Sequence, residues 1–154
     1  MTAPTMPDLE AEEARLILPG FDETVALRLG TLLANLGQAR NLPVVINIRG
    51  ANRTYFHAAL PGSTANNDNW ARRKSNTALM MGLPSLQIGA KHREKGGSLP
   101  EQGYPVEDFS DHGGAVPVVV AGVGMVAVAT VSGLPQLEDH RLVVAGIRAL
   151  LAEL

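Results

Sequence analysis

Two consecutive apolar segments in the C-terminal third of the chain constrain its fold more than any other feature. Residues 116–121 read Val-Pro-Val-Val-Val-Ala, and residues 125–131 read Met-Val-Ala-Val-Ala-Thr-Val. Alternate side chains of a strand point to opposite faces, so both runs predict strands that are apolar on both faces. Such strands lie inside a sheet that is covered on each side. With Gly122-Val123-Gly124 as a tight turn, the sequence predicts a central hairpin between two layers of other elements.

A second hairpin is predicted over residues 43–60, where two alternating runs flank Gly50-Ala51-Asn52. In a simple register one face of this hairpin is apolar. The other face then carries the polar side chains Asn47, Arg49, Arg53, Tyr55 and His57.

Helical spacing of apolar residues and capping residues predict four helices. They cover Leu9–Leu18 with Asp8 as the cap, Asp22–Arg40, Trp70–Met81 with a cap among Asn66, Asn67 and Asp68, and Gln136–Glu153. Residues 85–113 are rich in Gly, Pro and charge, so we expect mostly loop there, with a short strand or helical turn at Ser85–Ile88. A loop of this length in a small domain is typically functional or interfacial.

The order of these elements predicts an α+β fold in which helices pack on an antiparallel sheet of four to five strands. A length of 154 residues fits a single domain, with residues 1–7 expected to be flexible. We find no sequence repeat and no alternation of single strands and helices, so solenoid and dinucleotide-binding folds are not predicted.

Composition excludes several classes of function. The absence of cysteine rules out disulfides, thiolate metal sites and a cysteine nucleophile. A net charge of −2 and 4% aromatic residues argue against nucleic-acid binding. No segment is apolar for long enough to suggest a membrane span, and the acidic N-terminus does not resemble a secretory signal, so a cytoplasmic location is expected.

Three polar segments are candidates for a ligand site. The run Asn66–Lys74 joins a helix start to three adjacent cations, which suit a carboxylate or phosphate, or alternatively form a capped helix with a solvated basic face. The run Asp111–Gly114 places His112 beside paired glycines, as a ligand-binding bend or a simple strand entry. The run Ser132–His140 joins the last strand to the last helix, where acidic residues also complement the helix dipole.

The candidate ligand-binding residues are therefore Asn69, Trp70, Arg72, Arg73, Lys74, His112, Gly113, Gly114, Asp139 and His140. The four histidines show no metal-ligand spacing, so no metal site is predicted, and no catalytic residue is assigned. Asp139 and His140 are neighbours on a predicted helix, where their side chains diverge by about 100°. They are not expected to act as a dyad.

Five motifs in this order resemble one protein family. They are Leu42-Pro43-Val44, Phe56 with Pro61-Gly62-Ser63-Thr64, Asn69–Lys74, Gly113-Gly114-x-x-Pro117, and Val131–Pro135 with Asp139-His140. Over residues 15–154 the chain resembles uncharacterised members of the haem-degrading domain superfamily, which includes GlcG-like proteins, HbpS-like extracellular haem-binding sensor partners and the C-terminal domain of PduO-type adenosyltransferases. The resemblance implies a profilin-like α+β domain that assembles with itself as a dimer or larger ring.

The resemblance also implies haem as a candidate ligand. A haem site needs an axial ligand in an apolar cleft and cations for the propionates. His57, His112 and His140 are candidate axial ligands, and Arg72, Arg73 and Lys74 are candidate propionate partners. The sequence does not select among them.

Three hypotheses about function follow. The first is an oligomeric binding protein for haem or another small anionic molecule. The second is a scaffold in which Trp70, Gly113, Gly114 and the Leu134-Pro135 turn pack subunits together. The third is an enzyme acting on a small organic acid, with His112 or His140 as acid or base and Arg73 orienting the carboxylate.

Overall fold

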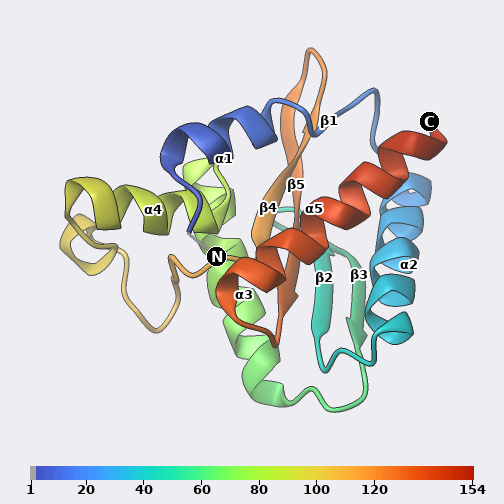
Figure 1. Cartoon of the computed structure of the whole chain (residues 1–154), viewed down its shortest axis with the longest axis horizontal. Helices are drawn as coiled ribbons and strands as arrows, with labels where there is room; N and C mark the ends of the chain where they lie inside the picture. The colour runs from blue at the N-terminus through green and yellow to red at the C-terminus, as the bar shows by residue number, and fades with distance from the viewer. Residues whose placement is uncertain (1–2) are drawn as a thin grey trace.

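The computed structural model describes residues 3–154 as an α+β fold around a five-stranded sheet (Figure 1). The strands are β1 (Ile17–Leu18), β2 (Val45–Arg49), β3 (Thr54–Ala59), β4 (Ala115–Val120) and β5 (Gly124–Ser132). Their order across the sheet is β1-β4-β5-β2-β3. Neighbouring strands are antiparallel except β1, which pairs with β4 in parallel. The predicted class is confirmed, and the short parallel strand makes the sheet mixed.

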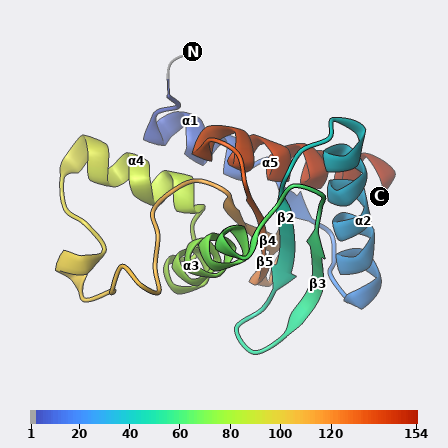
Figure 2. The same ribbon diagram turned by 90° about the horizontal axis from the view of Figure 1, so that it is seen from below.

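The helices are α1 (Met6–Glu13), α2 (Glu23–Ala39), α3 (Ala65–Met81), α4 (Ser85–Lys95) and α5 (Gln136–Glu153), with a 3-10 turn at Pro100–Gln102. Helices α2 and α5 pack on one face of the sheet and α3 on the other (Figure 2). Within residues 3–154, no helix combines the length and apolar character needed to cross a membrane.

The central hairpin is covered on both faces, as its composition predicts. Val118 of β4 and Ala129 of β5 lie in the main core with Leu33 of α2 and Ile147 of α5. On the other face, the β5 residue Val128 packs against Ala78 of α3. Burial of both faces explains why these strands lack the usual alternation of polar and apolar residues.

The predicted helix over Leu9–Leu18 is wrong at both ends. It begins at Met6 after the N-cap Thr5, and Asp8 is the third residue of a capping box. It ends at Glu13, because Ile17 and Leu18 add to the edge of the sheet beside Val119 and Val120. The buried Leu16 and Leu18 flank an exposed Ile17, which is the alternation of a strand.

The loop predicted over residues 85–113 is also wrong in its first part, since Ser85–Lys95 form α4. Leu86 and Ala90 of α4 pack against Leu9 of α1. Gly89 lies so close to the carbonyl of Asp111 that a Cβ could not be accommodated. The helical periodicity of α4 is hidden by Gly89, which this packing requires, and by the charged residues of its C-terminal half.

Helix α3 also begins before the predicted Trp70, with Thr64 and Asn67 forming its capping box.

The β2–β3 hairpin keeps most of its predicted polar face. Asn47 lies opposite His57, and a register shift follows between Ile48 and Arg49. This irregularity displaces Tyr55, which packs edge-on against Phe21, with ring centroids 5.3 Å apart. Tyr55 is therefore part of the apolar side rather than the polar face. Arg53, which lies over the Tyr55 ring and pairs with Glu23 of α2, also leaves the predicted polar face.

Candidate functional site

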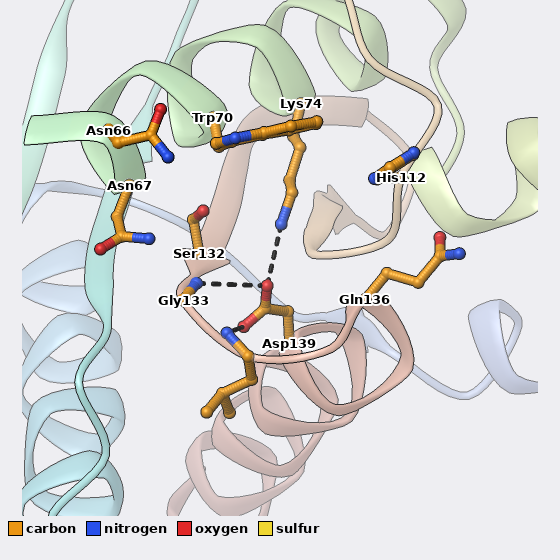
Figure 3. Close-up of a pocket in the computed structure, with 10 residues that line it drawn as sticks. Asn66, Asn67, Trp70, Lys74, His112, Ser132, Gly133, Gln136 and Asp139 are labelled. Carbon is orange, nitrogen blue, oxygen red and sulfur yellow. Dashed lines mark hydrogen bonds and ion pairs between the residues drawn. The ribbon is translucent and has the colours of Figure 1, made fainter. Parts of the chain in front are cut away.

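Three segments that are far apart in the sequence line one cavity of about 200 Å³ (Figure 3). They are the first half of α3, the bend before β4 and the corner between β5 and α5. The lining residues are Asn66, Asn67, Trp70, Lys74, His112, Ser132, Gly133, Leu134, Gln136 and Asp139. We call this the first cavity. The three polar segments singled out in the sequence therefore meet in space.

A buried ion pair forms one wall of the first cavity. Lys74 Nζ donates to Asp139 Oδ2 at 2.9 Å and lies 3.4 Å from the carbonyl oxygen of Val131. Asp139 also accepts the backbone N–H groups of Gly133 and Leu134, at 3.3 and 2.9 Å. The side chains of Lys74 and Asp139 are 4% and 1% exposed. The pair thus ties α3 to the β5–α5 corner (Figure 3).

Burial dominates the electrostatics of this pair. Loss of hydration lowers the pKa of Lys74, and the Asp139 charge only partly opposes that effect. Loss of hydration likewise raises the pKa of Asp139, against the attraction of Lys74 and the two backbone N–H groups. Each ion depends on the other to remain charged, because an unpaired charge in this position would be severely desolvated.

The paired glycines serve the packing of the chain itself. Gly113 donates its N–H to Gln136 Oε1 at 2.9 Å, and a Cβ there would lie 2.7 Å from the carbonyl oxygen of Gln136. Gly114 has a φ of +137°, and a Cβ there would clash with the carbonyl of Val131 and lie 2.9 Å from Lys74 Nζ. Gly113 thus lets the bend approach the start of α5, and Gly114 lets it approach the ion pair.

Trp70 and His112 also line a second cavity, of about 260 Å³. The two rings stack with centroids 5.0 Å apart and planes at 21°. The Arg73 guanidinium lies over the Trp70 ring, 4.3 Å from its centroid, and its Nε donates to the carbonyl of Val106 at 2.8 Å. The apolar part of this second cavity comes from Leu99, Pro100, Val106 and Phe109.

His112 differs from the other histidines in its partners. His57 contacts Asn47 and Asp68, His92 contacts Asp111, and His140 contacts Glu12 through ring nitrogens at 2.6–3.1 Å. His112 is exposed, and its ring nitrogens have no hydrogen-bond partner within residues 3–154. Among the histidines of residues 3–154, His112 is therefore the one whose ring nitrogens are free to bind a ligand.

Two other predicted site residues point away from both cavities. Arg72 bonds Asn69 Oδ1, the Glu107 carbonyl and the Asp108 carboxylate, the last at 2.9 Å. These contacts attach the loop after the 3-10 turn to α3. Arg72 and Asn69 line neither of the two cavities.

His140 also lies away from both cavities. It is 2% exposed, and its Nε2 lies 2.6 Å from Glu12 Oε1 of α1. The other ring nitrogen, Nδ1, is buried without a partner in residues 3–154. Asp139 and His140 thus point in different directions, as their spacing predicts, and His140 serves to hold α1.

The contact between Glu12 and His140 makes the stability of the fold sensitive to acid. The hydrogen bond from His140 lowers the pKa of Glu12. Ionised Glu12 therefore stabilises the fold above about pH 4.3, and this contribution is lost as the pH falls through the lowered pKa. Glu12→Gln is expected to reduce the free energy of unfolding by about 1–2 kcal/mol at pH 7.

Urea unfolding at pH 7 and pH 3 tests this expectation. The difference between wild type and Glu12→Gln should shrink at the lower pH. Glu10→Gln, on the exposed side of α1, is the matched control. A difference that is equal at both pH values would contradict the role assigned to the Glu12 carboxylate.

Several cavity residues were not among the sequence-based candidates. Asn66 and Asn67 belong to the run interpreted as an anion-binding helix start or a cap, Gln136 is predicted to begin the last helix, and Ser132 begins the segment before that helix. Their common signal is position, because each lies at an end of an element next to a candidate segment. Leu99 and Phe109 lie in the long segment that the sequence marks as functional or interfacial, but the lack of periodicity there gives no sign that these two side chains form cavity walls.

Comparison with known proteins identifies the family. A model described as "Haem degrading protein HbpS-like" matches residues 21–148. The chain belongs to the HbpS-like family. It is also 45% identical to a UPF0303 protein of Streptomyces coelicolor over 153 residues, which are 99% of this chain and 97% of that protein. The family resemblance seen in the sequence motifs is confirmed.

Solved structures agree with the fold. The Ybr137w protein is 32% identical, with a TM-score of 0.87 over 96% of this chain and 88% of that one. The PduOC protein, solved as a haem complex, is 16% identical, with a TM-score of 0.73 over 84% of this chain and 94% of that one. At this low identity the second likeness shows the shared fold alone.

Proposed function

We propose that this protein binds a small anionic ligand at the two cavities that share Trp70 and His112, with haem as the first candidate. The observation that carries the proposal is the free imidazole of His112, which borders both cavities. Arg73 supplies a cation beside the same aromatic pair. Membership of the HbpS-like family and the haem complex of a protein with this fold support the choice of haem.

The residues present fit haem. His112 offers an axial nitrogen, Arg73 offers a propionate partner, and Leu99, Val106 and Phe109 offer an apolar wall. Lys74 is not a propionate partner in this assignment, because Asp139 holds its ammonium group. When bound, haem would supply an iron centre whose coordination and redox chemistry the protein would tune.

The size of the cavities bears on self-association. Each cavity is below the roughly 300–1,000 Å³ typical of sites for drug-sized ligands. A haem would therefore extend beyond one cavity, and a second copy of the chain would complete its cover. A homodimer or larger ring is thus part of the proposal, and sedimentation with and without hemin measures it. The cytoplasmic location stays a prediction.

Titration with hemin tests the proposal. The wild type is expected to give a saturable shift of the Soret band. His112→Ala is expected to lose it, and added imidazole is expected to restore it by replacing the missing ligand. Arg73→Gln should weaken binding about tenfold, the loss expected for one charged hydrogen bond.

Arg93→Gln is the matched control, since Arg93 is exposed on α4 and lines neither cavity. Absence of a saturable shift in the wild type would reject haem as the ligand. A shift that His112→Ala leaves unchanged would reject the site.

One observation also favours an enzyme acting on a small organic acid. His112 and Arg73 line the same second cavity, where an imidazole could move a proton while the guanidinium holds a carboxylate. Incubation with a panel of small organic acids, followed by proton NMR, tests this candidate. Conversion of a substrate that is lost in both His112→Ala and Arg73→Gln would support it, and no conversion of any acid would count against it.

A further inference from the structure

Arg49 on β2 is a half-buried cation with neutral partners. Its Nε donates to Ser75 Oγ at 2.9 Å, and its Nη2 donates to Asn76 Oδ1. Within residues 3–154, no carboxylate lies within ion-pair distance of Arg49. Cations that lose hydration on folding are normally paired with an anion, so this arrangement lacks its counter-charge.

The charged group that most affects Arg49 is a second cation. Both loss of hydration and the charge of Arg72 lower the pKa of Arg49. Arg72 has its own acid, Asp108, which lies at the surface. The side chains of Ser75 and Asn76 fix the guanidinium of Arg49 and leave its Nη1 edge without a partner in the described chain.

A cavity of about 220 Å³ lies beside these two arginines. It lies between the β2–β3 hairpin and α3, and it shares no lining residue with the first or second cavity. The lining residues are Asn47, Arg49, Thr54, His57, Asp68, Ala71, Arg72 and Ser75. Two arginines and one carboxylate thus line this cavity, and that carboxylate, Asp68, is held by His57 Nε2 at 3.0 Å.

We propose that Arg49, with the positive charge of Arg72 beside it, forms a second binding site for a small molecule that carries an oxyanion group, a phosphate or a carboxylate. The planar fork of a guanidinium matches both groups, with two parallel N–H donors on one oxyanion. The fixed orientation of Arg49 leaves little side-chain entropy to lose on binding. The site stands on its own observations and does not depend on haem binding at His112.

Titration with inorganic phosphate and, separately, with acetate at constant ionic strength tests the proposal. The Nε–H signals of the arginines in ¹⁵N NMR spectra serve as the readout. The Arg49 signal is expected to shift and saturate. Arg49→Gln should weaken binding about tenfold or more, since it removes charged hydrogen bonds.

Arg53→Gln, on the same hairpin, removes the same charge from an exposed ion pair with Glu23 and should leave binding unchanged. Whichever of phosphate and acetate binds more tightly indicates the class of ligand. Saturable binding of either probe that is lost only in Arg49→Gln supports the site. No saturable binding, or an equal loss in Arg49→Gln and Arg53→Gln, overturns it.

A second pair of variants keeps the test valid if Arg49→Gln fails to fold. Thr54 is exposed, lines this cavity and lies opposite Arg49 across the strands. Thr54→Glu would place a tethered carboxylate beside the guanidinium, as in a cross-strand ion pair. It should block phosphate binding, whereas Thr54→Gln should retain it. Equal phosphate binding by both variants would contradict the proposal.

Discussion

Asp139→Ala is expected to lower the free energy of unfolding by about 3–5 kcal/mol, the loss expected when a buried ion pair is broken on one side. The change leaves Lys74 buried without its counter-ion and removes the acceptor of the Gly133 and Leu134 N–H groups. Urea unfolding at pH 7 measures it.

Glu138→Ala is the matched control, because Glu138 is the exposed neighbour on the same turn of α5. Its effect should stay within about 0.5 kcal/mol. The double change Lys74→Met with Asp139→Leu should recover the part of the loss that comes from the unpaired Lys74 charge, whereas the Gly133 and Leu134 N–H groups stay without their acceptor. A loss below 1 kcal/mol for Asp139→Ala would contradict the assigned role of the ion pair.

Gly114→Ala is expected to cause a loss of similar size or to prevent folding. Alanine would have to adopt a φ of +137°, and its Cβ would clash with the carbonyl of Val131 next to Lys74. Backbone strain of about 1–3 kcal/mol then adds to overpacking of about 1–3 kcal/mol. The unfolding midpoint in urea and the far-UV circular dichroism spectrum measure the outcome.

Gly122→Ala separates the two contributions. Gly122 has a φ of +74° with open space where a Cβ would lie, so this change adds strain alone. Gly114→Ala should therefore be clearly the more destabilising of the two. Equal losses would mean that the close approach at Gly114 is unimportant. A bulky residue at position 114 would disrupt the folding of the chain itself. Such a variant therefore cannot test the hypothesis that Gly114 packs subunits together.

The sequence predicted the central hairpin because this element depends on a simple pattern, since apolar residues on both faces require cover on both sides. The three polar segments were singled out by their residue types, and their meeting in one cavity is a finding of the structure. The helix at Ser85–Lys95 and the strand at Ile17–Leu18 depend on tertiary packing. Each depends on a contact between residues far apart in the sequence, Gly89 with Asp111 and Leu18 with Val120. No local sequence pattern indicates such contacts.

The basic run on α3 shows why the site itself was only partly predictable. Successive residues of a helix point about 100° apart, so three adjacent cations cannot serve one ligand. Arg72 contacts Asp108, Arg73 covers Trp70, and Lys74 is buried against Asp139. The sequence singled out this segment as a candidate, but only the partners in space decide which cation is free.

A ¹⁵N-labelled sample titrated with substoichiometric hemin tests the central claim most directly. The chain has one tryptophan, so a single indole N–H signal reports on the wall shared by the first and second cavities. Paramagnetic iron(III) broadens the signals nearest to it. The indole signal of Trp70 and the amide of His112 are expected to broaden first. Early broadening confined to α2 or the β2–β3 hairpin, with the Trp70 signal unchanged, would contradict the claim.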